Sequence, residues 1–382
     1  MKSHAVRGMG APMLALLLVA GTAAPALAGD AAGQLGSIIK RGQQLRDIQM
    51  TDEEEQQLGA AVSERIRARY GVVQDPAIHT YVTLVGTLLA QASDRPDLDW
   101  RFIVLDTDGV NALAAPGGYI HITRGALSLM KDEAALAGVL GHEVIHVTEK
   151  HTIRAIQKGK TMQLAADETL GDRAVFNRLV DRATDVVMAG FGRSEELESD
   201  QKGVVLANTV GYQPAGLSRF LQTLADRNKA STEKQGLFAS HPEMKERLEK
   251  LAKTIESKKL NAAADVQARF RSHVTYEPVP LTAIATVEEG SAGLAGGGSG
   301  GGKQEEQAKK EEEPKKKRGF GLARLTAPLT GGERRSAENT ASTGSRGVDT
   351  ERNARGGSNP APVPVTVTAA ELTAFRKEGG LN

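Results

Sequence analysis

Two histidines and a glutamate stand close enough in this sequence to bind a metal ion and use it in catalysis. They form the string His142-Glu143-Val-Ile-His146, which has the HExxH pattern. On a helix, residues four apart lie on the same face, so His142 and His146 can bind one zinc ion. Glu143, one residue further round, can take a proton from a water molecule at that ion. The alternative is a helix with two surface or core histidines, and this short string leaves both interpretations open.

A helix must position these residues, and the surrounding sequence predicts one. Asp132 can cap a helix that begins at Glu133. Apolar side chains then recur at intervals of three and four residues, as on the buried stripe of a helix. They are Leu136, Val139, Leu140, Val144 and Val147. We therefore expect His142, Glu143 and His146 to lie on one helix.

A zinc hydrolase usually takes three protein ligands and keeps a fourth position for water. A histidine six residues beyond His146 is one known third ligand, but that position is Thr152, and His151 lies well round a continuous helix. Glu196 is the better candidate, because it can complete a site of two histidines and one glutamate. Asp200, four residues later on the same helix face, can accept the remaining N–H of a ligand histidine. The alternative for this second segment is an exposed charged face.

The segments around these residues predict a mainly helical α+β domain over residues 51–289. Residues 100–105 alternate like a strand, and residues 111–123 form two short extended runs joined by Pro116-Gly117-Gly118. A small sheet should therefore lie beside the HExxH helix. Further helices are predicted from capping signals and apolar spacing. They begin after Thr51, at Pro76, within residues 162–191, after the cap Ser194, after Pro214 and after Pro242.

Residues 1–28 predict a secretory signal peptide. Lys2 and Arg7 precede an apolar run, and Ala26-Leu27-Ala28 supplies the small residues of a cleavage site. An uncleaved membrane anchor is the alternative, but the apolar run is short for a bilayer span. We expect a mature chain without a transmembrane span, located in the periplasm or, as the alternative, secreted.

Composition narrows the function further. The 48 basic and 47 acidic residues give a net charge of +1, which argues against a nucleic-acid partner, and the absence of cysteine excludes thiol catalysis.

Three further segments flank the predicted domain. Residues 29–50 are a short N-terminal segment that precedes it. Residues 290–360 are rich in glycine and charge and predict a flexible linker. Residues 361–382 contain a capping box at Thr368 to Glu371 and predict a small docking element, through which an envelope partner could bind.

Several separated motifs resemble peptidase family M48, the zinc metallopeptidases related to the CAAX prenyl protease and the heat-shock protease HtpX. The resemblance spans residues 52–251 and is greatest for the soluble periplasmic bacterial branch. It rests on residues 111–120, on residues 133–146 with His151, on Glu196-Leu-Glu-Ser-Asp200, and on His241-Pro242 with Arg247. Ser199 stands where the family usually has alanine, which exchanges one small residue for another.

The resemblance implies a gluzincin fold with one zinc ion per chain, bound by His142, His146 and Glu196, and with Glu143 as the general base. Its further implication is that His241 and Arg247 line the site. His241 would either latch onto the metal or contact the reacting carbonyl, and Arg247 could assist at the oxyanion.

The resemblance also implies how a substrate binds. Asn111, Ala112, Leu113 and Ala114 resemble the family's edge strand, which holds an extended protein or peptide by backbone hydrogen bonds. We therefore expect a zinc-dependent endopeptidase that hydrolyses unfolded or misassembled proteins in the cell envelope. The alternative is a periplasmic chaperone or assembly factor whose zinc site is mostly latched.

Overall fold

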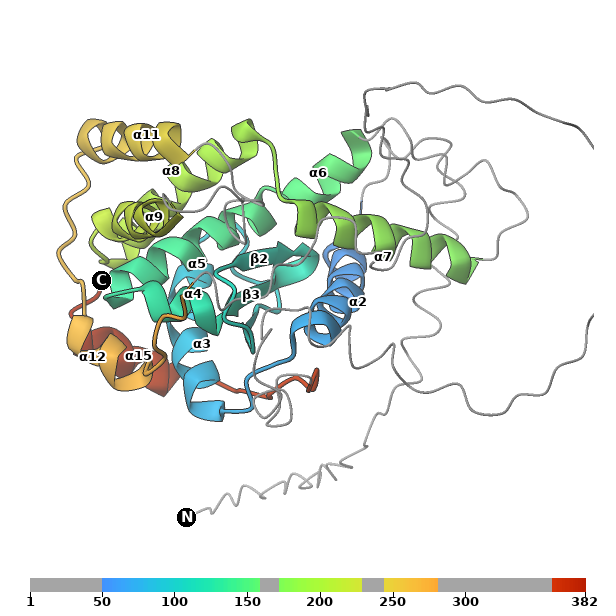
Figure 1. Ribbon diagram of the computed structural model, residues 1–382, viewed down its shortest axis with the longest axis horizontal. Coiled ribbons are helices and arrows are strands. Elements are labelled where there is room, and N and C mark those ends of the chain that lie inside the picture. Colours follow the sequence, from blue (N-terminus) through green and yellow to red (C-terminus); the bar gives the residue numbers. More distant parts are fainter. Residues whose placement is uncertain (1–49, 159–171, 229–243, 281–358) are drawn as a thin grey trace, which may run out of the picture.

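The structure is a computed structural model that describes residues 50–158, 172–228, 244–280 and 359–382. In this part of the chain, helices surround a small sheet (Figure 1). The helices are α2 (Asp52–Tyr70), α3 (Pro76–Gln91), α4 (Arg124–Leu129), α5 (Glu133–Thr148), α6 (His151–Lys158), α7 (Asp172–Ala189), α8 (Arg193–Val210), α9 (Ala215–Asn228), α11 (Met244–Ser257), α12 (Gln267–His273) and α15 (Ala369–Glu378). The strands are β1 (Arg101–Leu105), β2 (Ala112–Ala115) and β3 (Tyr119–Thr123). The predicted α+β class is confirmed.

The sheet has the strand order β1-β3-β2. β1 runs parallel to β3, and β2 runs antiparallel to β3 with Leu113 opposite His121. The connection from β2 to β3 is a short 3-10 turn, Pro116–Gly118. Gly117 has a φ of 68°, and a Cβ there would meet the backbone of Gln56, so the turn favours glycine. β2 is therefore an edge strand among the described strands.

The two faces of the sheet contribute to two separate apolar clusters, because side chains alternate along a strand. The cluster on one face also contains residues of α3, α5, α8 and α9, and the cluster on the other face contains residues of α2, α6 and α7. The first cluster takes Phe102, Val104, Ile120 and Ile122 from the sheet, and the second takes Ile103, Leu105 and Leu113. The sheet thus lies between two helical layers, and α5 is the helix of the first layer that carries HExxH.

Most helix starts follow the predicted capping signals. Thr51 forms a capping box with Glu54, and the Asp132 carboxylate accepts the amide of Ala135 at 2.8 Å. α8 differs, because it begins at Arg193 with Gly192 as its N-cap and no side-chain cap. The Ser194 hydroxyl instead donates to the Glu195 carboxylate at 2.7 Å, so the predicted N-cap at Ser194 was wrong by two residues.

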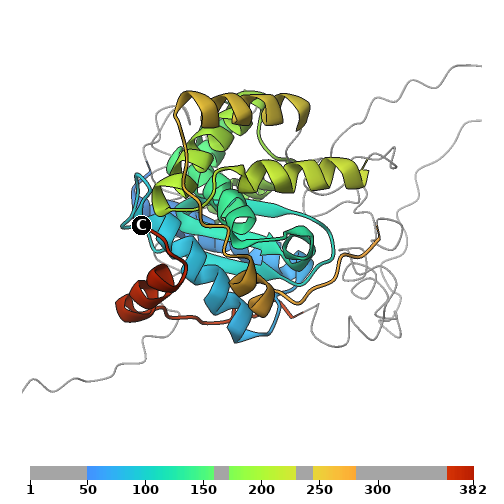
Figure 2. The same cartoon turned by 90° about the vertical axis from the view of Figure 1, so that its left-hand side faces the viewer.

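Residues 359–382 pack against the rest of the described chain. α15 lies beside α3 and α12 in both views (Figures 1 and 2), with Leu372 and Phe375 buried. The Arg269 guanidinium donates to the Phe375 carbonyl at 2.6 Å and lies over its ring, and the Asn382 amide donates to the Val210 carbonyl at 2.9 Å. The apolar face of α15 is thus covered by the chain's own helices, and binding of an envelope partner through this tail stays a prediction.

Several sequence predictions fall outside the described residues. They include the signal peptide at residues 1–28, the linker over most of residues 290–360, and His241. Among the helices that are described, none has the length and apolar character needed to cross a bilayer.

Candidate metal centre

α5 carries the HExxH residues in the interior of the protein. His142, Glu143 and His146 are all buried, and α5 packs against α3, α8 and α9. The predicted helix and its N-cap are therefore present, and His142 and His146 lie one turn apart on it. The position of this helix leaves its histidines facing the neighbouring helix α8.

Two glycines let α5 and α8 come close together beside His142. A Cβ added to Gly203 would lie 2.8 Å from the His142 backbone nitrogen, and one added to Gly141 would lie 3.0 Å from the Gly203 carbonyl oxygen. Neither contact leaves room for a larger residue. Because the backbones touch here, the first turns of α8 bring Glu196 and Asp200 within reach of the histidines.

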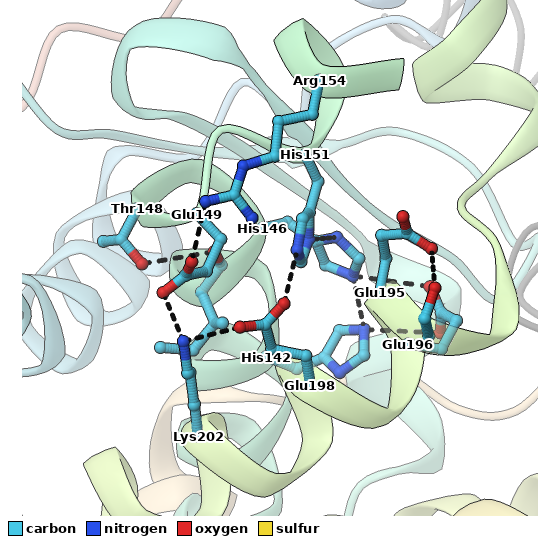
Figure 3. Close-up of polar contacts among 12 residues, drawn as sticks. His142, His146, Thr148, Glu149, His151, Arg154, Glu195, Glu196, Glu198 and Lys202 are labelled. Carbon is cyan, nitrogen blue, oxygen red and sulfur yellow. Dashed lines mark hydrogen bonds and ion pairs between the residues drawn. The ribbon is translucent and has the colours of Figure 1, made fainter. Parts of the chain in front are cut away.

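Three nitrogen and oxygen donors converge between the two helices (Figure 3). The Nε2 atoms of His142 and His146 are 3.0 Å apart. The Glu196 carboxylate places Oε2 at 3.6 Å from His142 Nε2 and Oε1 at 3.5 Å from His146 Nε2. Among the described residues, these three form the one group of histidine, aspartate and glutamate donors able to hold a metal ion.

The spacing of these donors fits one shared metal ion. Ligand atoms about 2.1 Å from a tetrahedral zinc lie roughly 3.4 Å from one another. The two Nε2 atoms are 3.0 Å apart, and each lies 3.5 or 3.6 Å from one oxygen of the Glu196 carboxylate, so the three side chains are close enough to bind the same ion. A cation between two ring nitrogens and a carboxylate also stabilises their close approach electrostatically. The residues present therefore fit a metal with two histidine ligands and one glutamate ligand.

A buried ion pair lies behind His142. His142 Nδ1 donates to Asp200 Oδ1 at 2.9 Å, and Arg247 donates to the same carboxylate through Nε and Nη2, each at 2.8 Å. Burial alone would raise the pKa of Asp200, but the charge and hydrogen bonds of Arg247 outweigh it and lower the pKa to about 2. Asp200 is thus a fixed anion that leaves His142 Nε2 directed at the metal position.

Arg247 also reaches the third ligand. Its Nη1 lies 3.1 Å from Glu196 Oε2. Burial would lower the pKa of Arg247, yet the charges of Asp200, Glu196 and Glu143 raise it above its usual value. The structure therefore places Arg247 behind two acidic residues of the site, where it positions them. A contact between Arg247 and the reacting carbonyl stays a prediction.

A second histidine lies behind His146. The Nδ1 atoms of His146 and His151 are 2.9 Å apart, and His151 Nε2 lies 3.3 Å from Glu198 Oε2 (Figure 3). The ring of Phe191 stacks on His146 with centroids 4.2 Å apart. Burial lowers the pKa of His151, with Glu198 acting in the opposite direction. Asp200 lies behind His142, whereas neutral His151 lies behind His146.

The sequence interpretation was wrong about the direction of His151, because its ring lies against that of His146. A continuous helix would carry His151 away from His146, but α5 ends at Thr148. Lys150 has a positive φ of 54°, and α6 begins at His151. This break directs the His151 ring back toward His146. A single positive φ at a lysine gives no signal in the sequence. The contact of Phe191 with His146 was also missed, because no sequence pattern links these two residues.

The predicted substrate strand lies close to the same site. Asn111 precedes β2, and its carbonyl accepts the Thr123 amide at 3.0 Å. A small hollow is lined by Ala114 and Ala115 of β2 and by His146, with Glu55 and Lys150 at its side. The structure thus places the edge strand next to one ligand histidine. Peptide binding along residues 111–114 stays a prediction.

Comparison with known proteins places this arrangement among the proteases. Residues 76–255 match peptidase family M48. The β-barrel assembly-enhancing protease of Escherichia coli (strain K12) is 24% identical over 208 residues, covering 51% of this chain and 42% of that protein. The metalloprotease YcaL of the same strain is 30% identical over 164 residues, covering 42% and 63%. The mitochondrial metalloendopeptidase OMA1 of Schizosaccharomyces pombe is 26% identical over 205 residues, covering 52% and 60%.

The matched residues contain the whole candidate site. His142, His146 and Glu196 all lie within residues 76–255, and so do Glu143, Asp200 and Arg247. The chain spans less than half the length of the β-barrel assembly-enhancing protease, so that protein's whole activity does not transfer with the match. From the converging ligands and this match together, we conclude that the chain contains a metallopeptidase domain of peptidase family M48.

Proposed function

We propose that this protein is a zinc-dependent endopeptidase with one zinc ion per chain, held by His142, His146 and Glu196. The observation that carries the proposal is the convergence of these three buried donors within 4.8 Å of one another, with Glu143 at the adjacent position of α5. Two histidines and a glutamate are the ligand set of catalytic zinc in hydrolases, and this set leaves one coordination position for substrate or water.

The residues around the ligands have separate tasks in this proposal. A bound zinc ion supplies Lewis acidity, which polarises a carbonyl and lowers the pKa of water from ~16 toward ~7. Glu143 accepts the proton of the attacking water and returns it to the leaving amine. Asp200 and Arg247 hold His142 and Glu196 in place. Burial of these groups excludes bulk water and strengthens each of these interactions.

The edge position of β2 supports a substrate bound as an extended strand. Residues 111–114 lead to the hollow beside His146, so a peptide paired with this edge would pass the metal position. Backbone hydrogen bonds hold such a peptide largely independently of its side chains. This mode suits unfolded or misassembled proteins, whose backbone is accessible, rather than folded ones.

A location in the cell envelope agrees with the sequence and with one relative. Residues 1–28 have the features of a signal peptide, and a relative is named for β-barrel assembly. We propose that the protein is exported to the periplasm and acts on misassembled envelope proteins there. The chaperone alternative depends on His241, which lies outside the described residues.

Metal analysis and proteolysis test the proposal together. The wild-type chain should contain about one zinc and cleave casein, chelator should abolish cleavage, and zinc should restore it. Glu196→Ala should lose both zinc and cleavage. Glu143→Gln should keep zinc and fold but lose ~100-fold or more of the rate, because the proton acceptor is gone. The matched control Glu195→Gln, which changes a partly buried carboxylate on α8 that pairs with Lys158, should behave as wild type.

Two results would overturn the proposal. Full activity in a clean Glu143→Gln preparation would remove the hydrolase mechanism, and a wild-type chain without zinc would remove the metal site. Zinc binding without any cleavage would favour the chaperone alternative instead.

A further inference from the structure

The hydrogen bonds behind His146 form a line that runs from the metal site to the protein surface. His146 contacts His151, His151 contacts Glu198, and Glu198 accepts from Lys202 Nζ at 2.6 Å. His151 is 1% exposed, whereas the side chains of Glu198 and Lys202 are 35% and 45% exposed. A single buried side chain, that of His151, therefore separates the ligand His146 from the partly exposed Glu198.

The proton positions along this line follow from the geometry. His146 must present the lone pair of Nε2 to the metal, because Nε2 faces His142 and Glu196. The proton of neutral His146 is then on Nδ1, which donates to Nδ1 of His151. His151 can accept there only when its own proton is on Nε2, which donates to Glu198.

The opposite tautomer of His151 would work against metal binding. With its proton on Nδ1, His151 would either oppose the Nδ1 proton of His146 or force that proton onto His146 Nε2. The first arrangement loses a buried hydrogen bond, and the second blocks the metal lone pair. The Glu198 carboxylate makes this tautomer unfavourable, because it is an acceptor and needs a proton on Nε2 of His151.

We propose that His151 and Glu198 are positioning residues for the metal, which hold His146 in its metal-binding tautomer through the hydrogen-bonded line from Glu198 to His151 to His146. This inference rests on the proposed zinc site. Neither residue touches the metal or the substrate. Their effect is on how tightly the site retains its ion, so the surface carboxylate Glu198 controls metal affinity through a buried neutral histidine.

The test is zinc affinity, measured on the full chain by competition with a chromophoric chelator, and the cobalt absorption spectrum of the same proteins. His151→Phe removes the acceptor and should lower zinc affinity by ~10–100-fold. Glu198→Ala should cause a smaller loss, of about threefold to tenfold. Glu195→Ala, which removes a neighbouring carboxylate that pairs with Lys158 on the surface, is the matched control and should leave affinity unchanged.

His151→Asn separates tautomer control from other effects. The asparagine Oδ1 can replace His151 Nδ1 as an acceptor and has no tautomer to select. Zinc affinity and the cobalt bands should therefore stay close to wild type. Adding Glu198→Ala to His151→Asn should then cause no further loss of zinc affinity. In the protein that keeps His151, Glu198→Ala should lower zinc affinity.

The possible outcomes are distinct. A folded His151→Phe protein with wild-type zinc affinity and cobalt bands would overturn the inference. An equal loss from Glu198→Ala in both backgrounds would also overturn it, because the carboxylate would then act by charge alone. If His151→Phe does not fold, the comparison of His151→Asn with the double variant His151→Asn/Glu198→Ala decides. A wild-type chain that binds no zinc would reject the proposed function itself, which is a different result from wild-type binding that the variants leave unchanged.

Discussion

His142 and His146 lie one turn apart on the same helix, yet the groups behind their rings differ in charge and in distance from solvent. Behind His142 are the buried anion Asp200 and the buried cation Arg247. Behind His146 are neutral His151 and the partly exposed Glu198. Loss of one member costs more free energy for a buried ion pair than for a neutral hydrogen-bonded pair. The stability of the fold should therefore depend on the groups behind His142, whereas substitutions of the groups behind His146 should change metal affinity.

The largest expected effect is loss of the cation on the His142 side. Arg247→Met leaves Asp200 and Glu196 buried without their positive partner, which should lower the free energy of unfolding by about 3–5 kcal/mol. Denaturant unfolding of the metal-free proteins measures it. Arg193→Met is the matched control, because Arg193 pairs with Glu246 at the surface and should contribute less than about 1 kcal/mol. Equal, small losses in both variants would contradict the proposed dependence of the fold on this side.

A third buried histidine extends the comparison to a ring with no carboxylate behind it. His121 on β3 contacts the Ser63 hydroxyl at 2.9 Å, and burial lowers its pKa to about 3. The unfolded chain binds this proton near pH 6.5 and the folded chain does not, so stability should fall as pH drops from about 6.5 toward 3. The slope from one group is at most ~1.4 kcal/mol per pH unit.

Denaturant unfolding of the wild type and His121→Gln across this pH range tests that slope. The variant should lose the part of the acid dependence that one group supplies. The rest should remain, from His79 and His151, whose pKa burial also lowers, and from Asp200, whose pKa Arg247 holds low. The same acid dependence in both proteins would show that His121 is protonated in the folded state.

Much of the fold follows from local sequence signals. The capping box at Thr51, the cap at Asp132 and the turn at Pro116–Gly118 each specify an element by contacts within a few residues, and each is present. α4, α6 and α12 were not predicted, since they are short and owe their stability to packing rather than to apolar periodicity. Val363, Val365 and Val367 stand at alternate positions, as in a strand, but residues 363–367 pair with none of the described strands and form none.

The sequence predicted the candidate ligands and the contact of Asp200 with a ligand histidine, but not the other supports of the site. HExxH and the Glu196 segment have fixed spacings on helices, so the sequence carries their geometry. The close approach of Gly141 to Gly203 joins two distant segments, and the turn at Lys150 reverses the direction expected for His151. Both depend on tertiary packing, which one sequence does not encode in any local pattern.

Asp200→Asn should weaken metal binding without the loss of fold expected for Arg247→Met. The amide oxygen can still accept from His142 Nδ1, and Arg247 keeps Glu196 as a partner. Loss of the negative charge makes His142 a weaker ligand, so zinc affinity should fall by ~10–100-fold. Competition with a chelator measures it, and Asp99→Asn at the surface is the control. An unchanged affinity would mean that Asp200 serves the fold alone.

The smallest effect should come from the outermost residue on the His146 side. Lys202 pairs with Glu198 and Glu149, each at 2.6 Å, but its side chain is 45% exposed. Solvent screening limits such pairs to about 1 kcal/mol or less, so Lys202→Ala should change zinc affinity by less than about fivefold. Glu198 can still accept from His151 without Lys202, because that hydrogen bond needs only the carboxylate. A loss as large as that of His151→Phe would show that the charge of Lys202, rather than the tautomer of His151, governs metal retention on this side.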